Sequence, residues 1–482
     1  MANETPIPYK SFEQNFRVRK LNSIYSEKFS HSKLKGVDRL NGYSFACRAK
    51  TELKTISHKS LNADYKFSPY LELLKSKGRG KEPRILAIPT IRDRIVLNAL
   101  KEVLFEVFPE CVKRDFSNSF VHKIKQTADL RNPQVGFFRT DIKNFYGSID
   151  HSILLKKIKT KTRSKKILKM IKRSISRPIV PKIYRKDNLK SYRVSGVPQG
   201  LSISNILAEI YMHEVDEIMQ KDSRVIHYCR YVDDILIIAR RDHIADVVKT
   251  LTLNLPSSED SSLELNEDKT HTNVVLADGF RVSKTFEYLG YLFDNGSVAP
   301  KKSSEEKIIR SVISEFCEYR HAFEKLIKSR KKHKRKKAEM DKLKKAIIFR
   351  LNERITGAIS EKKKYGWIFY FSEINDLSSL HRIDSVIRRI FNSRSEFGNK
   401  APANLKKVSR AYYEAKYTPR SGYIHDYSNY RTVEQKRDFL IGSGFDTEAR
   451  LKGLKPNSVI KKFDLLMRRN LSKLVEDETF IY

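Results

Sequence analysis

The sequence predicts an α+β fold in which a core of mixed strands and helices is followed by a mainly helical part. Between Arg84 and about Phe293, short β-branched and aromatic runs alternate with helical patterns. After Lys301 the strand signals largely stop and helical spacing takes over. A chain of 482 residues has room for about three domains of roughly 150 residues each, so it can bury its own cores without disulfides.

The expected elements follow the chain in order. Strands are predicted at 84–88, 135–142, 225–228 and 235–239. An amphipathic helix is predicted over Ser204–Gln220, because its apolar residues recur mostly three or four positions apart. Four parts are expected: an N-terminal basic extension (1–79), a strand-and-helix core (80–300), a helical basic part (301–400) and a tyrosine-rich C-terminal segment (401–482).

The charge of the chain indicates its class of partner. Lys and Arg number 96 against 57 Asp and Glu, which gives a formal net charge of +39. Such an excess is unusual for an enzyme of small metabolites and points to a polyanion, with nucleic acid as the first expectation. Hydrophobic residues make up 40% of the chain, so the charge belongs to a folded protein rather than to a disordered tail.

The four cysteines are far apart and show no paired spacing, which argues against both a disulfide framework and a zinc ribbon. No run of about 18 apolar residues is present, and the first residues have no apolar core. We therefore expect a cytoplasmic protein without a membrane span.

Three carboxylates stand beside apolar strand residues, where an unpaired charge is costly. Asp233 and Asp234 lie at a tight turn between two predicted strands, and Asp141 ends another. An Asp-Asp turn alone is most often a solvated hairpin tip, but its place between apolar strands favours a metal site. Oxygen ligands of this kind suit Mg²⁺, and two such ions about 4 Å apart support nucleotidyl transfer.

Six motifs resemble those of prokaryotic reverse transcriptases, in the order of that family. They are Lys81–Arg94 (KEPRILAIPTIRDR), Thr140–His151 (TDIKNFYGSIDH), Ser195–Asn205 (SGVPQGLSISN), Tyr231–Asp234 (YVDD), Leu265–Thr270 (LNEDKT) and Glu287–Phe293 (EYLGYLF). The resemblance implies an RNA-directed DNA polymerase with the right-hand fold, in which fingers and palm precede a helical thumb. It also implies an RNA template, a DNA product and deoxynucleoside triphosphates as substrates.

The resemblance implies roles for residues at the matching positions. Asp141, Asp233 and Asp234 would be the catalytic carboxylates, and the Ile142 carbonyl would complete a site for two Mg²⁺ ions, with Mn²⁺ as a substitute. The residues implied to bind the nucleotide are Tyr146 as a steric gate against ribonucleotides, Gln199 and Gly200 as the pocket floor, Lys81 and Arg84 at the triphosphate, and Lys269 at the leaving group. Core packing is the alternative for the tyrosine, and an ordinary surface position for the two fingers cations.

Two segments are expected to contact nucleic acid. Tyr288, Leu289 and Gly290 lie in the implied primer grip, and Lys334, Arg335, Lys336 and Lys337 lie in the cationic run Lys328–Lys345. A solvated helix face is the alternative for that run. A third group, Tyr412, Tyr413, Tyr417, Tyr423, Tyr427 and Tyr430, is expected either to pack, to stack on bases or to prime synthesis.

The family subtype is suggested by what the sequence lacks. No Cys/His cluster follows Lys301, and the Val-Thr-Gly segment of retron enzymes is missing near Gly279–Lys284. The chain is therefore most similar to defence-associated reverse transcriptases of bacteria (unknown-group or abortive-infection type), which implies cDNA synthesis on a structured non-coding RNA during antiphage defence. A group II intron maturase-like RNA-binding protein, a retron-type enzyme and template-independent synthesis remain alternatives, and the oligomeric state, including a homo-oligomer, stays open.

Overall fold

The computed structural model describes residues 7–76, 80, 82–112, 117–127, 130–183, 193–259, 262–276, 282–329 and 333–478. Lys81 and the side chain of Lys334 lie outside this description. The chain forms two compact units, of which unit 1 comprises residues 1–115 and 132–283, and unit 2 comprises 116–131 and 284–482. Both units contain strands and helices, so the predicted α+β class is confirmed.

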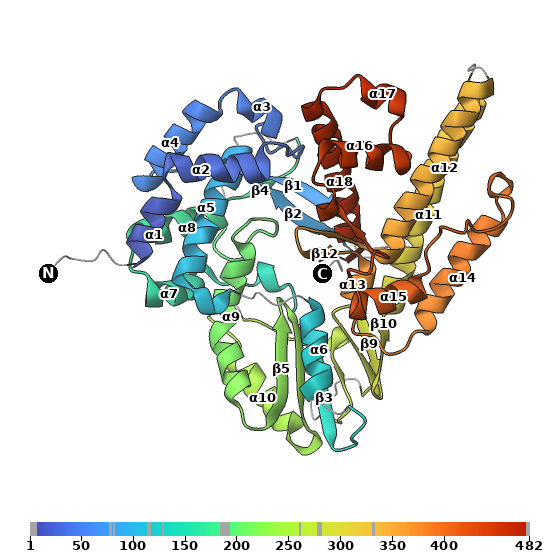
Figure 1. Ribbon diagram of the computed structural model, residues 1–482. Coiled ribbons are helices and arrows are strands. Elements are labelled where there is room, and N and C mark those ends of the chain that lie inside the picture. The colour runs from blue at the N-terminus through green and yellow to red at the C-terminus, as the bar shows by residue number, and fades with distance from the viewer. Residues whose placement is uncertain are drawn as a thin grey trace. The chain divides into compact units, whose positions relative to one another are not determined.

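Among its described residues, unit 1 contains two sheets covered by helices (Figure 1). Its helices are α1 (Ile7–Asn15), α2 (Val18–Ile24), α3 (Gly42–Ala46), α4 (Ala49–Leu61), α5 (Ile91–Val107), α7 (His151–Lys161), α8 (Lys165–Ile175), α9 (Ser204–Lys221) and α10 (Ile244–Asn254). Its strands are β1 (Tyr70–Lys75), β2 (Arg84–Ile88), β3 (Val135–Asp141), β4 (Ile179–Val180), β5 (Val225–Tyr231), β6 (Asp234–Arg240) and β7 (His271–Thr272).

The four-stranded sheet of unit 1 has the order β5-β6-β3-β7. Strand β6 is central and buried from Asp234 to Ala239, which explains its continuous apolar run. It pairs antiparallel with β3 from Val135 opposite Arg240 to Asp141 opposite Asp234. Helix α9 packs on β5, and α10 packs on β3 and β6. The four predicted strands and the helix predicted from Ser204 are confirmed.

The N-terminal stretch that was expected as a basic extension is folded into unit 1. Phe12 on α1 and Phe16, which directly follows that helix, are buried in the same core as the apolar face of α5. Helix α5 begins at an N-cap, since the Thr90 side chain accepts a hydrogen bond from the Asp93 amide. The second sheet of unit 1 has the order β2-β1-β4. Arg84 is the first residue of β2.

The described part of unit 2 is mainly helical and contains two small sheets, β10-β9-β8 and β12-β11-β13. Its helices are α6 (Ser117–Thr127), α11 (Lys302–Ile327), α12 (His333–Thr356), α13 (Trp367–Tyr370), α14 (Ser378–Asn392), α15 (Val408–Tyr417), α16 (Val433–Gly442), α17 (Glu448–Lys452) and α18 (Pro456–Glu478). Its strands are β8 (Thr285–Tyr288), β9 (Tyr291–Asp294), β10 (Ser297–Pro300), β11 (Ala358–Ser360), β12 (Lys363–Tyr365) and β13 (His425–Asp426).

The helical pattern expected after Lys301 is interrupted by the hairpin β11–β12, which the sequence did not predict. Gly357 ends the preceding helix with a φ of 67°, and a Cβ at that position would meet the Tyr365 carbonyl. A glycine is therefore needed here, because only glycine allows the Tyr365 carbonyl to come this close. At Gly357 the chain leaves the helix and enters β11. In the described part of the chain, no helix is long and apolar enough to cross a membrane.

Candidate active site

The turn between β5 and β6 carries two of the predicted carboxylates. Tyr231 pairs with Asp234 across the hairpin, so only Val232 and Asp233 form the loop. Val232 has a φ of 61°, the left-handed value that glycine usually takes at the first central position of a type II′ turn. A β-branched residue is strained in this conformation, and such strain persists only where surrounding contacts hold the backbone.

A buried arginine holds this turn. Arg230 donates to Glu209 Oε2 at 2.7 Å and to the two carboxylate oxygens of Asp216 at 2.7 and 2.6 Å. Its Nη1 also donates to the Val232 carbonyl at 2.7 Å. Because both carboxylates lie on α9, the helix fixes the guanidinium, and the guanidinium fixes the strained turn.

These network residues were not predicted from the sequence. A signal was present, because Glu209 and Asp216 fall among buried apolar residues of α9, and the inner face of an amphipathic helix rarely carries an acid without a partner. Arg230, the cation directly before the Tyr231–Asp234 motif, is the natural candidate for that partner.

The third carboxylate meets the turn across the sheet. Asp141 is the cross-strand partner of Asp234, and the Ile142 amide donates to the Asp233 carbonyl at 3.1 Å. Asp141 and Asp234 are only 7% and 3% exposed. The structure thus brings Asp141 next to Asp233 and Asp234, which the sequence placed on a separate segment.

The electrostatics of this carboxylate cluster favour a cation. Burial raises the pKa of Asp234 to about 7; the Arg139 guanidinium opposes this shift, and the charges of Asp233 and Asp141 add to it. Burial also raises the pKa of Asp233, and Asp141 adds to that shift. Among the described residues, no hydrogen bond reaches the buried Oδ1 atoms of Asp141 and Asp233. Uncompensated carboxylate oxygens of this kind fit a divalent ion.

Two basic side chains border the cluster. The Lys269 ammonium donates to Asp141 Oδ2, and Arg139 Nε lies 3.0 Å from Asp234 Oδ1. Arg139 also donates to the Lys269 carbonyl at 2.9 Å. Lys269 is more than half exposed, so its ammonium can leave the carboxylate for another anion, whereas Arg139 is held in place.

The comparisons with known proteins agree with this geometry. Residues 75–293 match the family model described as "Reverse transcriptase (RNA-dependent DNA polymerase)". These residues form a reverse transcriptase domain. The predicted family resemblance is thereby confirmed, and the domain contains all three carboxylates of the cluster.

The chain is similar to a group II intron-encoded protein and to two further proteins. LtrA of Lactococcus lactis subsp. cremoris is 27% identical over 202 residues, which cover 40% of this chain and 32% of LtrA. An uncharacterized 91 kDa protein in the cob intron of Schizosaccharomyces pombe is 28% identical over 163 residues, which cover 33% of this chain and 19% of that protein. Protein YkfC of Escherichia coli K12 is 24% identical over 249 residues, which cover 42% of this chain and 63% of YkfC. The chain thus spans about a third of LtrA.

The residues predicted to bind nucleotide lie in different surroundings within the reverse transcriptase domain. Arg84 is near enough to Asp233 that its charge lowers the pKa of that carboxyl against the effect of burial. Tyr146 is half-buried; burial raises the pKa of its hydroxyl, and the charge of Asp233 adds to the shift. Gly200 has a φ of 103°, and a Cβ there would lie 2.8 Å from the Ala87 carbonyl oxygen. The glycine therefore permits a close approach to β2, whereas the sequence had suggested an approach to substrate.

The predicted primer-grip residues form the turn between β8 and β9 in unit 2. Leu289 and Gly290 both have positive φ, at 50° and 79°, as in a type I′ hairpin. Tyr288 and Leu289 are each 1% exposed, and the Leu289 carbonyl accepts a hydrogen bond from Tyr370 at 2.8 Å. Their side chains are packed inside, so a contact with nucleic acid could use only the backbone and the shape of the hairpin.

The predicted basic run lies at the start of α12. Arg335 and Lys337 are exposed, while Lys336 is half-buried and donates to the Ile327 carbonyl. The tyrosine group divides similarly between surface and interior. Tyr412 and Tyr427 are buried with bonded hydroxyls, whereas the remaining members are exposed or half-buried: Tyr413, Tyr417, Tyr423 and Tyr430.

Proposed function

We propose that the chain is an RNA-directed DNA polymerase that forms phosphodiester bonds at the Asp141, Asp233 and Asp234 cluster. The observation that carries this proposal is the cross-strand pairing of Asp141 with Asp234 beside a two-residue turn that contains Asp233, within residues 75–293. Asp141 and Asp234 are buried and Asp233 is half-buried, and such a group of carboxylates has no evident structural purpose, because uncompensated charge destabilises a fold.

The side chains around the cluster have different proposed roles in the reaction. The three aspartates, with the Ile142 carbonyl, would hold two divalent ions, Mg²⁺ or Mn²⁺. Such ions supply Lewis-acid activation of a 3′-hydroxyl and neutralise charge on a triphosphate. Lys269 would place positive charge at the departing pyrophosphate. Positioning of the nucleotide is assigned to Lys81 and Arg84 at the phosphates, Tyr146 under the sugar, and Gln199 and Gly200 at the pocket floor.

We further propose that the template is a structured non-coding RNA and that the role is antiphage defence. The net charge of +39 supports a nucleic-acid partner, and the family resemblance supports the defence role. Residues 80–300 would form the fingers and palm, and residues 301–400 the thumb.

The polymerase proposal is tested by primer extension on an RNA template with purified chain and Mg²⁺. We expect Asp233→Asn and Asp234→Asn to abolish synthesis. Asp242→Asn is the matched control, because Asp242 follows the same hairpin but is 57% exposed and pairs with Arg240. Synthesis that survives both turn substitutions would refute the proposed site.

The template proposal needs a separate experiment. RNA that accompanies the purified chain is sequenced beside the DNA made from labelled deoxynucleotides, with Asp233→Asn as the control. DNA that matches one co-purified RNA supports a dedicated template. Homopolymeric DNA would indicate template-independent synthesis, and tight RNA binding without DNA under any primer would favour the maturase-like alternative.

A further inference from the structure

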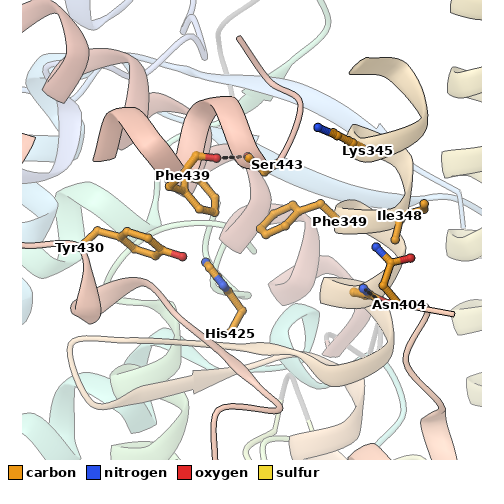
Figure 2. A pocket seen from close by; sticks show the side chains of 10 residues that line it. Lys345, Ile348, Phe349, Asn404, His425, Tyr430, Phe439 and Ser443 are labelled. Atoms are coloured by element: carbon orange, nitrogen blue, oxygen red, sulfur yellow. Dashed lines mark hydrogen bonds between the residues drawn. The ribbon is translucent and has the colours of Figure 1, made fainter. Parts of the chain in front are cut away.

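Unit 2 contains a cavity of about 340 Å³ that the proposed polymerase chemistry does not use. Figure 2 shows the side chains that line it, which come from α12, from the segment before α15, from β13 and the loop after it, and from α16. The lining residues are Lys345, Ile348, Phe349, Asn352, Asn404, His425, Tyr430, Phe439, Gly442 and Ser443. Its size lies at the lower end of the range for pockets that bind small molecules, about 300–1,000 Å³.

Aromatic rings form much of the wall. The His425 ring stacks on Phe439 with centroids 5.3 Å apart, and Phe349 stands edge-on to these two rings at 5.1 and 5.2 Å. The ring centroids of Tyr430 and Phe439 lie 4.7 Å apart. Phe349, His425 and Tyr430 are half-buried, so packing leaves part of each ring accessible.

His425 supplies an unused polar atom within this wall. Its Nε2 is buried and has no hydrogen-bond partner among the described residues. Burial lowers the pKa of His425 to about 4, and the charge of Lys406 adds to the shift. The ring is therefore neutral at pH 7, so one nitrogen is a donor and the other an acceptor. A flat heterocycle with polar atoms along its edge suits such a wall.

The ten lining residues named above include one cation, Lys345, and no carboxylate. Lys345 is exposed and extends from α12, the helix that also carries the predicted cationic run. Asn352 donates to the Asn404 carbonyl at 3.0 Å and accepts from the Lys406 amide at 2.8 Å. These bonds hold the segment before α15 against α12 and so keep the rim in place. The Lys345 ammonium at the rim can contact a phosphate of the ligand.

We propose that this cavity binds one unpaired nucleobase of single-stranded RNA. The base stacks on the accessible rings of Phe349 and Tyr430, meets His425 Nε2 with its polar edge, and leaves its phosphate near Lys345. The ligand is thus a base splayed from a loop or bulge rather than a paired one. The inference rests on RNA as the partner in the proposed function, and it does not depend on polymerisation.

The test measures RNA affinity of the full chain in solution at one fixed salt concentration. One probe is a fluorescein-labelled 12-nucleotide RNA, and the other has the same backbone with every internal base removed. We expect Phe349→Leu to weaken binding of the base-containing RNA about tenfold and to leave the abasic probe unchanged. Phe445→Leu is the matched control, because Phe445 packs edge-on against Phe349 at 5.5 Å but does not line the cavity.

A second substitution tests the edge contact. His425→Phe keeps an aromatic ring in the wall but removes both nitrogens, and we expect it to reduce affinity for the base-containing RNA about fivefold. Equal affinity of wild-type chain, Phe349→Leu and His425→Phe for that RNA would overturn the proposal. Equal weakening of both probes by Phe349→Leu would also overturn it, because the contact would then not depend on the base.

Photo-crosslinking of the unaltered chain gives a result that does not depend on how a variant folds. RNA substituted with 5-iodouridine is irradiated in complex with the chain, and crosslinked peptides are mapped by mass spectrometry. Crosslinks to Phe349, His425 or Tyr430 support the site. Failure of this RNA to bind, or crosslinks confined to segments outside the cavity, would overturn it. Asp233→Asn separates the two proposals, because it removes DNA synthesis and leaves this binding intact.

Discussion

Two buried arginines, one in each unit, have similar surroundings but different tasks. Arg230 lies between Glu209 and Asp216 of unit 1, and Arg354 lies between Glu315 and Asp477 of unit 2. Their remaining contacts differ.

Arg230 also bonds the carbonyl of the strained residue Val232, whereas Arg354 bonds the Lys473 carbonyl within α18 at 2.8 Å. The first network holds the two-residue loop between β5 and β6. The second joins helices that already pack on one another, α11, α12 and α18. A buried ion network thus indicates function where one of its hydrogen bonds is made to the carbonyl of a strained residue. Without that bond the backbone would move to an unstrained conformation.

The strongest test of this difference replaces each arginine with lysine. A lysine keeps the charge but cannot reach two carboxylates and a carbonyl at once. We expect Arg230→Lys to lower the maximal rate of primer extension about a hundredfold, because a shift of about 1 Å in catalytic groups has an effect of that size. Arg354→Lys should leave the rate per folded molecule within about threefold.

Circular dichroism and the fluorescence of the single tryptophan, Trp367 of unit 2, check that each variant is folded. If Arg230→Lys extends primers at close to the normal rate, the turn is not held by Arg230 and the contrast between the two networks fails.

The next test concerns stability alone. Glu315 is buried beside Arg354 and Lys473, so Glu315→Gln should lower the unfolding free energy of unit 2 by about 3 kcal/mol. Glu318 contacts the same Lys473 at 3.2 Å but is 42% exposed, and Glu318→Gln should change it by less than about 0.5 kcal/mol. Urea denaturation followed by Trp367 fluorescence measures both. Equal effects of the two substitutions would show that burial does not decide the outcome.

A smaller effect is expected from pH. Burial raises the pKa of Glu353 to about 8, and its Tyr427 and Asn470 partners oppose the shift. The folded state therefore keeps a proton that the unfolded state releases near pH 4.5. Stability is greatest below that pH and falls as pH rises through about 8. Between pH 6.5 and 8 the unfolding free energy of unit 2 should fall by about 2 kcal/mol, and Glu353→Gln should remove this slope.

His425 does not contribute to the slope above pH 6.5. Its pKa is lowered to about 4, so its contribution to stability is lost only as pH falls below 6.5. Tryptophan-monitored urea curves at several pH values test the slope. A slope that persists unchanged in Glu353→Gln would assign the pH dependence to another group.

The weakest effect belongs to solvated charges. Reversal of Arg335, Lys336 and Lys337 on α12 should reduce RNA affinity about tenfold at low salt and flatten the log-log salt dependence by about 0.7 for each lost phosphate contact. Reversal of Lys452, Lys455 and Lys461, which are exposed as Arg335 and Lys337 are, changes the net charge equally and serves as the control. Identical salt slopes for the two variants would remove the basic run from the RNA-binding surface.

The predictions that succeeded rest on local patterns. The apolar run of Ile235–Ala239 and the spacing along Ser204–Gln220 are visible in a short window, so β6 and α9 were found nearly to the residue. The aspartates were found because a motif joins them to flanking strands, although their cross-strand pairing required the sheet register.

What was missed depends on contacts between distant segments. Phe349, His425 and Tyr430 are ordinary residues of separate elements until the fold places them around one cavity. The link from Arg230 to Glu209 spans 21 residues, so the acids on the apolar face of α9 indicate that a partner is needed but do not identify it. The hairpin after Gly357 was missed because the backbone conformation, rather than side-chain periodicity, ends the helix.

The pairing of Asp141 with Asp234 limits how this domain can change in evolution. Side chains alternate between the two faces of a strand, so a one-residue insertion within β3 or β6 would turn one of these carboxylates to the opposite side of the sheet. Because β6 is also paired with β5 over the same length, a compensating slip would have to move two ladders at once. Length variation in the family should therefore collect in the connections outside 135–141 and 225–240, while these strands keep a constant number of residues.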